Sequence, residues 1–277
     1  MINNNFIEGK VSEMIRIGGL GRVSGGWLLL AALMVMIYAT PPVKAQAKPD
    51  AGQGVSAQDI LKYADVVRFP PEGFEVSIRI RTSQQGSLKE ERLLKVLSKG
   101  NDNTVVMTVE PASERGQILL MKGRDLWFFL PKVSQPVRLS LAQRLVGQVS
   151  NGDIARANFA GDYTPTLVGM ETVGNDRLYV LDLIATDRGV SYQHVRYWVK
   201  QSGYWPQKAE FYSLSNRLLK SCRYEEFRPL AGKVRPTKLV MIDALKKDEE
   251  STLEYSDMRL RELPDRIFSK EYLRRLE

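Results

Sequence analysis

Residues 74–81 read FEVSIRIR, and this stretch decides how the chain folds. Its four apolar residues alternate with polar or charged ones. Because successive side chains of a strand point to opposite faces, the alternation predicts a strand with one buried face and one wet face. Residues 83–86 are typical of a turn, so residues 92–98 are expected to return as a partner strand.

Similar short runs follow along the chain, separated by turns rich in glycine, asparagine and aspartate. Because strands of this kind are joined by short turns and do not alternate with helices, we expect a mainly antiparallel sheet. The predicted further strands are 105–109, 117–122, 125–130, 166–173, 177–185, 192–200, 206–213, 218–227, 237–244 and 251–260.

Helical spacing is confined to short segments. It predicts helices at 56–67 and 269–276, and one or two more within 140–159, where Leu141, Leu145 and Val149 lie four residues apart. About a dozen strands are too many for a flat open sheet. The sequence therefore predicts a mainly β (α+β) fold, an incomplete antiparallel β-barrel curled around an apolar cavity and lidded by short helices.

The N-terminus carries a different pattern. Residues 27–39, WLLLAALMVMIYA, form an uncharged run preceded by Arg16 and Arg22 and followed by Ala45-Gln46-Ala47. A basic lead, a short apolar core and a small-x-small site are typical of a secretory signal peptide. The run is shorter than the roughly 20 residues that a membrane-spanning helix needs.

We therefore predict a signal peptide at 1–47 that is removed on export to the periplasm. A linker at 48–56 and one domain at 57–277 would follow it. An uncleaved N-terminal anchor is the alternative. Translation from Met14 would give a more ordinary lead.

The chain has a formal net charge of +8 at pH 7 and one cysteine, Cys222. Mild basicity suits an anionic membrane surface or an acidic partner, and it serves solubility equally well. A single cysteine cannot form an internal disulfide. Since no cysteine lies directly after the apolar run, where a lipid would be attached, we expect a soluble mature protein that carries no lipid anchor.

Side chains that carry catalysis or bind metals are scarce. The one histidine, His194, lies within a predicted strand, without a cluster of further cysteine or histidine ligands. We therefore expect no metal, no cofactor and no enzyme activity, and interpret His194 as structural. A hydrolase with His194 as its base is the weakest alternative. Basic and aromatic residues do not interleave as in RNA-binding modules, so no nucleic acid is expected as a partner.

The predicted strands share a rich apolar face. Most of its residues could form an ordinary packed core. Alternatively, the few short helices would not fill the curled sheet, which would leave an apolar cavity for a ligand. Eight aliphatic residues are expected on this one face: Val76, Ile78, Ile80, Val105, Met107, Val109, Leu181 and Leu183.

Residues 123–162 read GRDLWFFLPKVSQPVRLSLAQRLVGQVSNGDIARANFAGD. With LWFFLP, the basic Arg138 and a helix that ends in an SNGD turn, this stretch resembles outer-membrane lipoprotein-sorting proteins of the LolA/LolB-like superfamily. Two later segments are similar to the same family, VRYWVKQSGYWPQKAEFYSLSNRLLKSCRY at 195–224 and FSKEYL at 268–273. The resemblance covers roughly residues 57–276.

The resemblance implies an incomplete barrel with a cavity for acyl chains and no catalysis. Members of this branch are thought to act alongside transporters of the resistance-nodulation-division type. We add Trp127 and Phe129 to the eight aliphatic residues as candidate ligand contacts. The first hypothesis is a periplasmic carrier or chaperone that moves lipid or lipoprotein acyl chains toward the outer membrane. The alternative is an accessory subunit that docks on an inner-membrane transporter. In both cases we expect a monomer.

Overall fold

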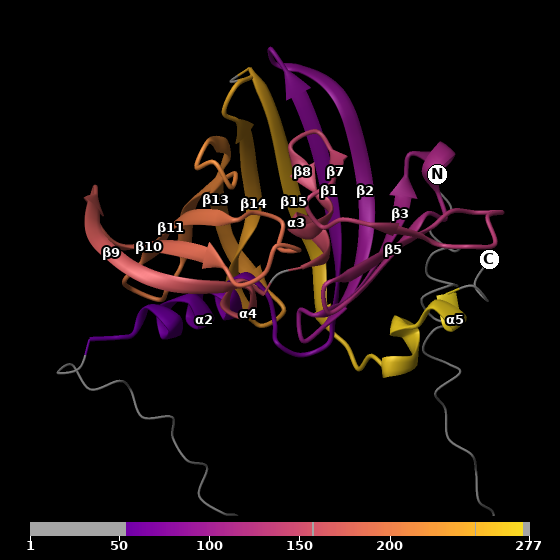
Figure 1. Ribbon diagram of the computed structural model, residues 1–277, viewed down its shortest axis with the longest axis horizontal. Helices are drawn as coiled ribbons and strands as arrows, with labels where there is room; N and C mark the ends of the chain where they lie inside the picture. Colours follow the sequence, from indigo (N-terminus) through magenta and orange to yellow (C-terminus); the bar gives the residue numbers. More distant parts are fainter. Residues whose placement is uncertain (1–53, 157, 247, 274–277) are drawn as a thin grey trace, which may run out of the picture.

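Thirteen strands form one antiparallel sheet in the computed structural model, which describes residues 54–273 except 157 and 247 (Figure 1). The order across the sheet is β6-β5-β4-β3-β2-β1-β15-β14-β13-β12-β11-β10-β9. β1 pairs with both β2 and β15, so the first and last long strands meet in the middle. β6 and β9 lie at opposite ends of this order, and the sheet stays open. The predicted incomplete antiparallel barrel is confirmed.

The bounds of the strands agree with the sequence pattern within a few residues for most of the chain. The strands are β1 (Phe74–Gln84), β2 (Ser87–Lys99), β3 (Asn103–Glu110), β4 (Ile118–Lys122), β5 (Asp125–Phe129), β6 (Val137–Leu139), β9 (Tyr163–Val173), β10 (Asp176–Ala185), β11 (His194–Lys200), β12 (Pro206–Tyr212), β13 (Leu218–Leu230), β14 (Lys233–Asp243) and β15 (Glu249–Leu260). A separate hairpin pairs β7 (Arg144–Val146) with β8 (Val149–Ser150).

The helices are short. They are α2 (Ala57–Arg68), α3 (Asn151–Ala155), α4 (Phe159–Asp162) and α5 (Lys270–Leu273), with single 3₁₀ turns η1 (Ala112–Glu114) and η2 (Asp265–Phe268). Among the described residues, no helix is both long and apolar enough to cross a membrane. The predicted signal peptide at 1–47, the start at Met14, most of the linker and the end of the last predicted helix lie outside the described residues.

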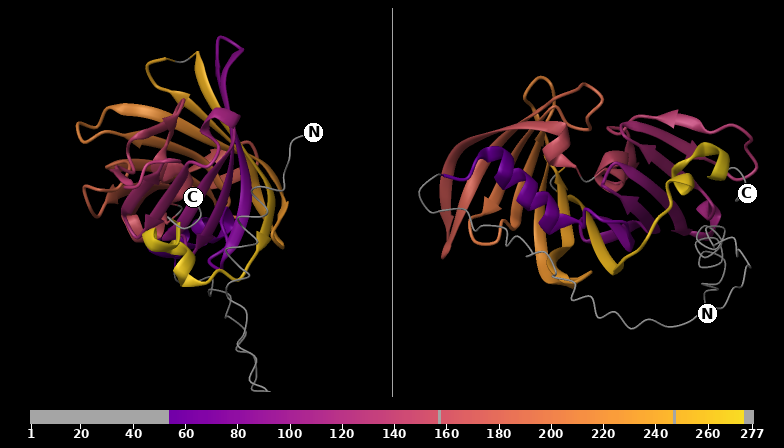
Figure 2. Two further views of the ribbon diagram at one scale, coloured as in Figure 1. Left: turned by 90° about the vertical axis from the view of Figure 1, so that its right-hand side faces the viewer. Right: turned by 90° about the horizontal axis from the view of Figure 1, so that it is seen from below.

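Helix α2 covers one half of the curled sheet (Figures 1 and 2). Ser56 caps the helix, since its Oγ accepts a hydrogen bond from the Asp59 backbone N–H at 3.1 Å. Ile60, Leu61 and Ala64 are fully buried and belong to the main apolar cluster. The helix contacts β9, β12 and β14. We call the sheet face that carries this cluster the inner face, β1–β6 the first half and β9–β14 the second half.

The outer face of the first half carries a second apolar cluster, covered by η2 and α5. Alternation along β3 decides which residues face which side. Val106 belongs to the inner cluster, whereas its neighbours Val105 and Met107 belong to the outer one. Phe129 is also in the outer cluster, and Trp127 packs against it. The prediction that Val105 and Met107 share one face with Val76 and Leu181 is therefore wrong.

The helical prediction for 141–149 is also wrong. This segment forms a turn followed by the hairpin β7–β8, and a helix begins only at Asn151. Gly147 turns the chain with φ of +49°, and a side chain there would collide with Thr82 and Ser251. Ser150 does not end a helix but begins one, because it forms a capping box with Asp153. The four-residue spacing reflects burial in this packed segment, where Leu141 and Val149 are nearly inaccessible.

Candidate functional site

The inner face of the first half forms the floor of an open pocket of about 380 Å³. Its apolar floor comes from four neighbouring strands, with Leu94 on β2, Val106 on β3, Leu119 on β4 and Phe128 on β5. Val106 lies opposite Leu119, and Leu119 lies opposite Phe128, so the strand register brings these side chains together. The floor is therefore a continuous apolar surface built from residues far apart in the sequence.

Residues 139–145, which run from the end of β6 through a turn at 141–143 into β7, cover this pocket. Leu139 and Leu145 add apolar surface, and Gln143 and Arg144 add polar groups. We call this the cover segment. It is tied to α3 by the Asn151 side chain, whose Nδ2 donates to the Ser140 carbonyl at 3.0 Å. Asn151, the first residue of α3, and Glu114 of η1 also line the pocket, so short helical turns complete its wall beside the cover segment.

Arg92 on β2 joins the floor to the cover segment. Its Nη1 donates to the Leu145 carbonyl at 2.8 Å, and its Nη2 forms ion pairs with Glu114 at 3.1 Å and Glu90 at 3.0 Å. The buried Nε has no acceptor among the described residues. Because a guanidinium presents several donors in a fixed plane, this one side chain can bind both Leu145 of the cover segment and Glu114 of the pocket lining.

The hairpin β7–β8 is anchored to the opposite side of the interior through Gln148. The Gln148 backbone N–H donates to Ser251 Oγ at 2.9 Å, and its Nε2 donates to Glu249 Oε1 at 2.6 Å. Lys220 on β13 donates from Nζ to the Gln148 carbonyl at 2.6 Å. The hairpin thus crosses the interior between the two halves of the sheet.

Lys220 also forms a buried ion pair. Its Nζ lies 2.6 Å from Asp153 Oδ2, and both side chains are less than a tenth exposed. Tyr192 donates from its hydroxyl to the same Oδ2 at 2.9 Å. Burial, reinforced by the negative charge of Asp153, raises the pKa of Tyr192 well above its ordinary value. This phenol therefore stays neutral and acts as a donor that fixes α3 to the second half.

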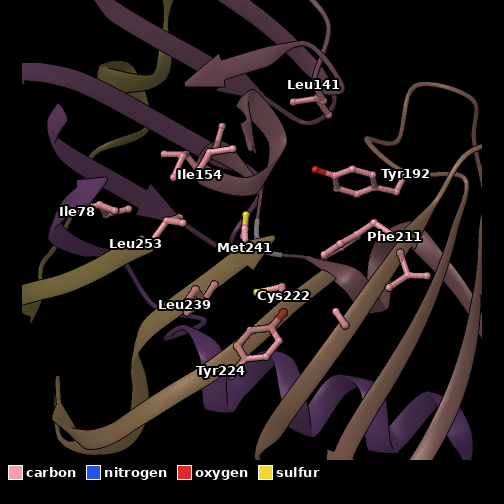
Figure 3. Close-up of a cluster of buried hydrophobic side chains, with 14 of the residues drawn as sticks. Ile78, Leu141, Ile154, Tyr192, Phe211, Cys222, Tyr224, Leu239, Met241 and Leu253 are labelled. Atoms are coloured by element: carbon pink, nitrogen blue, oxygen red, sulfur yellow. The ribbon is translucent and has the colours of Figure 1, made fainter. Parts of the chain in front are cut away.

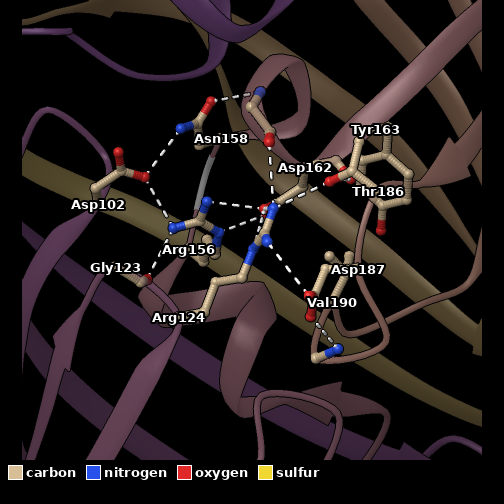
Figure 4. Close-up of polar contacts among 12 residues, drawn as sticks. Asp102, Gly123, Arg124, Arg156, Asn158, Asp162, Tyr163, Thr186, Asp187 and Val190 are labelled. Carbon is tan, nitrogen blue, oxygen red and sulfur yellow. Dashed lines mark hydrogen bonds and ion pairs between the residues drawn. The ribbon is translucent and has the colours of Figure 1, made fainter.

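A second polar cluster fixes the end of α3 and the start of β9 (Figure 4). Arg156 contacts Asp162 through Nη2 at 2.8 Å and Asp102, in the β2–β3 turn, through Nη1 at 2.8 Å. Arg124, in the β4–β5 turn, contacts Asp162 at 3.2 Å. Because these turns belong to the first half and Asp162 leads into the second, the cluster ties the two halves together.

A second, polar pocket of about 270 Å³ lies next to the hairpin. Arg144 lines both this pocket and the open pocket, so the two are neighbours across β7. The other charged residues that line the polar pocket are Arg217, Lys220 and Asp243. Apolar groups line it as well, namely Ala142, Val149, Leu218, Leu219 and Leu245.

The inner face of the second half is filled by large side chains (Figure 3). The rings of Tyr192 and Phe211 are 4.4 Å apart between centroids, and those of Phe159 and Tyr197 are 5.5 Å apart. A pocket of about 20 Å³ lies beside Phe159, Tyr192 and Phe211, which is room for one water molecule. Cys222 is buried here, and burial raises the pKa of its thiol to about 12, so it is an unreactive core residue.

The ten predicted contact residues do not line these three pockets. Val76, Ile78, Ile80, Leu181 and Leu183 lie on the inner face as buried core. Val105, Met107 and Phe129 lie in the outer cluster, Trp127 packs against that cluster, and Val109 is buried. A direct role of the five inner residues in ligand binding stays a prediction.

The residues that form the open pocket were missed for an identifiable reason. Phe128 lies between Trp127 and Phe129, and the LWFFL run does not say which of its neighbours points inward. Leu94 could have been predicted from the sequence, because it lies opposite Ile78 in the hairpin that the turn at 83–86 predicts. The register of that hairpin carries Leu94 onto the inner face.

His194 has both ring nitrogens engaged. Nε2 lies 2.9 Å from Asp182 Oδ1, and Nδ1 lies 2.9 Å from Asn216 Oδ1. The side chain joins three neighbouring segments, which is the arrangement of a structural histidine. Within residues 54–273, no group of three or more His, Cys, Asp or Glu side chains is placed to hold a metal ion.

Comparisons with known proteins include a relative of high identity. A LolA superfamily protein of known structure from Nitrosomonas europaea is 58% identical, with a TM-score of 0.76, and the alignment covers 79% of this chain and 99% of that chain. A family model described as an uncharacterized protein matches residues 100–275. The comparison with curated proteins gives no match.

Two further solved structures share the fold. A putative outer membrane lipoprotein-sorting protein domain from Vibrio parahaemolyticus is 19% identical, with a TM-score of 0.68 over 79% of this chain and 98% of that chain. A DUF1329 family protein from Desulfovibrio piger is 21% identical, with a TM-score of 0.67 over 78% and 97%. The open curled sheet and the high identity over almost all of the Nitrosomonas protein lead to one conclusion: this chain belongs to the LolA superfamily.

Proposed function

We propose that this protein is a periplasmic carrier that binds acyl chains of lipids or lipoproteins in the open pocket and transfers them toward the outer membrane. The observation that carries the proposal is the pocket itself, about 380 Å³ over an apolar floor of Leu94, Val106, Leu119 and Phe128. That volume falls within the roughly 300–1,000 Å³ usual for small-molecule sites.

The driving force is the removal of hydrocarbon from water. Each methylene group buried against such a floor contributes about 0.8 kcal/mol. An acyl chain lying along the four strands would therefore bind by its length and not by a specific polar contact. Such binding needs neither a cofactor nor a catalytic group, and accordingly the carrier is not an enzyme.

The remaining parts of the chain fit this role. Residues 1–47 serve as a cleaved signal peptide for export, and 48–56 link it to one lipid-binding domain at 57–277, which acts as a monomer. The membership in the LolA superfamily supports a periplasmic location.

Native mass spectrometry tests the proposal directly. We expect protein purified gently from periplasm to carry co-purified lipid or to take up added phospholipid. Leu94→Trp replaces an aliphatic side chain on the pocket floor with a bulky indole ring. It is expected to reduce lipid uptake at least about tenfold, the effect of losing two methylene contacts.

The matched control is Leu88→Trp on the same strand, at a side chain that is 56% exposed. It should bind lipid as the wild type does. Apo protein that takes up no lipid under any condition would contradict the carrier role. Equal lipid uptake by both variants would exclude this pocket as its site.

A second candidate function has one specific observation in its favour. Strand β9 is an edge of the sheet, eleven residues long, and exposes Leu167, Val168, Met170 and Val173. Long, apolar and almost uncharged edges can pair with a strand of another chain. This edge could dock an accessory subunit on an inner-membrane transporter of the resistance-nodulation-division type.

Photo-crosslinking in cells separates the two functions. A photoreactive residue at Met170 on β9 should capture a stoichiometric transporter partner if docking is the function. The same residue at Val137, on the opposite edge strand β6 and 47% exposed, is the control. A transporter captured from Met170 by protein without bound lipid would favour the accessory subunit over the carrier.

A further inference from the structure

We propose that the ligand is an anionic lipid, whose charged head group is bound by Arg144 and Arg217 at the polar pocket. This inference rests on the proposed carrier function and names the class of lipid. The acyl chain occupies the open pocket, and the head group lies across β7, in the neighbouring pocket lined by both arginines.

The position of Arg144 carries the first step. Its side chain lines the open pocket together with Leu145 and lines the polar pocket together with Gln148. A molecule with an apolar tail and a polar head that occupied both spaces would pass beside this guanidinium. The two pockets therefore offer an apolar space and a charged space on either side of the same guanidinium.

The second step is the charge that these pockets leave uncompensated. Neither Arg144 nor Arg217 has an ion-pair partner in the described part of the chain, and both are exposed at the pocket rim. Other exposed arginines, such as Arg188 and Arg266, also lack an ion pair among the described residues, so Arg144 and Arg217 are distinguished by their position in the lining of the polar pocket.

The other charged groups of the polar pocket do not cancel these two arginines. Lys220 is neutralised by Asp153 at 2.6 Å. Asp243 is the one acidic residue of the lining, and its Oδ1 accepts hydrogen bonds from the backbone N–H groups of Leu245 and Lys246 at 2.7 and 2.8 Å. An excess of positive charge remains at the rim.

The third step is the chemistry of the guanidinium. Arginine presents paired donors in a plane that match the oxygens of a phosphate or carboxylate, and such charge-assisted bonds are stronger than neutral ones. Two arginines without an ion-pair partner, one of which also lines the open pocket, therefore favour a phospholipid with a net negative head group over a zwitterionic or neutral one.

The experiment is a competition between two lipids that differ only in the head group. Wild-type protein is incubated with an equimolar mixture of dioleoyl phosphatidylglycerol and dioleoyl phosphatidylcholine, and bound lipids are counted by native mass spectrometry. We expect a preference of about tenfold or more for the anionic lipid, the size of one good charge-assisted contact.

The double variant Arg144→Gln/Arg217→Gln should lose that preference while it still binds acyl chains. The charge-matched control is Arg188→Gln/Arg266→Gln, two exposed arginines that do not line either pocket. It removes the same net charge and should keep the preference. Inorganic phosphate alone should bind the wild type weakly, because it lacks the acyl chain.

Each result has a separate meaning. Equal binding of both lipids by the wild type, or an unchanged preference in Arg144→Gln/Arg217→Gln, overturns the head-group site and leaves the carrier function standing. Tight binding of inorganic phosphate that excludes lipid overturns a lipid as the source of the anion. Binding of neither lipid overturns both the carrier function and this inference.

Discussion

The two halves of the inner face solve the same packing problem in different ways. In the second half, Arg68 of helix α2 lies over the rings of Phe159 and Tyr224, Tyr192 packs on Phe211, and the pocket between these side chains has about 20 Å³. In the first half, Leu94 and Leu119 face the cover segment and the start of α3 at Asn151, and the pocket between them has about 380 Å³. The same curled sheet is therefore tightly packed on one side and borders an open pocket on the other, where the floor residues Leu94, Val106 and Leu119 are themselves less than 5% exposed.

The difference teaches what creates room inside a curled sheet. Side-chain volume and the kind of cover explain the contrast, because an aromatic ring fills space that an aliphatic side chain leaves. Helix α2 also inserts three fully buried apolar residues, whereas Leu139 and Leu145 of the cover segment are only half-buried. The polar anchors at Arg92 and Lys220 hold the boundary between the two regions.

The strongest test of this contrast truncates one phenylalanine in each half. Phe211→Ala removes a ring from the packed half, where it is 2% exposed, and should lower the free energy of unfolding by about 3–5 kcal/mol. Phe128→Ala removes a ring that borders the open pocket and is only half-buried, so the loss should be clearly smaller. Urea unfolding of both variants measures the difference, and equal losses would mean that the halves are packed alike.

The pH dependence of stability probes a group that belongs to the packed half alone. Burial raises the pKa of Asp65 on α2 from 3.8 to about 6, although Arg68 acts in the opposite direction. The folded state favours the protonated carboxyl. The contribution of this carboxyl to the free energy of unfolding is therefore fully present below about pH 4 and is lost as the pH rises through about 6.

Asp65→Asn should remove this dependence while its side-chain oxygen still accepts from the Ala160 N–H. Between pH 4 and pH 7, wild-type stability relative to the variant should fall by roughly 3 kcal/mol, the linkage value of a shift of about two pKa units. Denaturant unfolding of both proteins at the two pH values gives this number. Parallel pH profiles would show that the carboxyl is not desolvated.

The smallest expected effect concerns the outer side of the first half. Lys270 on α5 lies with Nζ 3.9 Å from the centroid of the Trp127 ring. Lys270→Gln should lower the free energy of unfolding by about 0.5–1 kcal/mol, the usual value of an exposed cation–π contact. Lipid binding should stay unchanged, because this contact is on the outer face. A change in lipid uptake would place Trp127 in the ligand site after all.

The sequence allowed the strands to be predicted far better than the pocket. The alternation in residues 74–81 identifies only one strand and its two faces. Local patterns of this kind located nearly every other strand as well. The open pocket depends on which of Trp127 and Phe128 points inward, a choice set by pairing with β4 and not by the run itself. A run of apolar residues that does not alternate with polar ones cannot show which of its side chains point to the inner face.

The cover segment was missed for a different reason. Leu141, Leu145 and Val149 have helical spacing, but Gly147 and the hydrogen bond from the Gln148 N–H to Ser251 favour a hairpin. Ser251 is about a hundred residues away, so a local pattern cannot anticipate the contact. Long-range polar contacts of this kind overrode a weak helical signal.

One measurement tests the central claim most directly. The protein is crystallised with phosphatidylglycerol that carries bromine atoms on its acyl chain, and the anomalous signal of bromine locates the chain. We predict bromine peaks between Leu94, Leu119 and Phe128 on the floor and Leu145 on the cover segment. Peaks in the aromatic half or on the outer face beside Trp127, or crystals without ordered bromine despite bound lipid, would contradict the account.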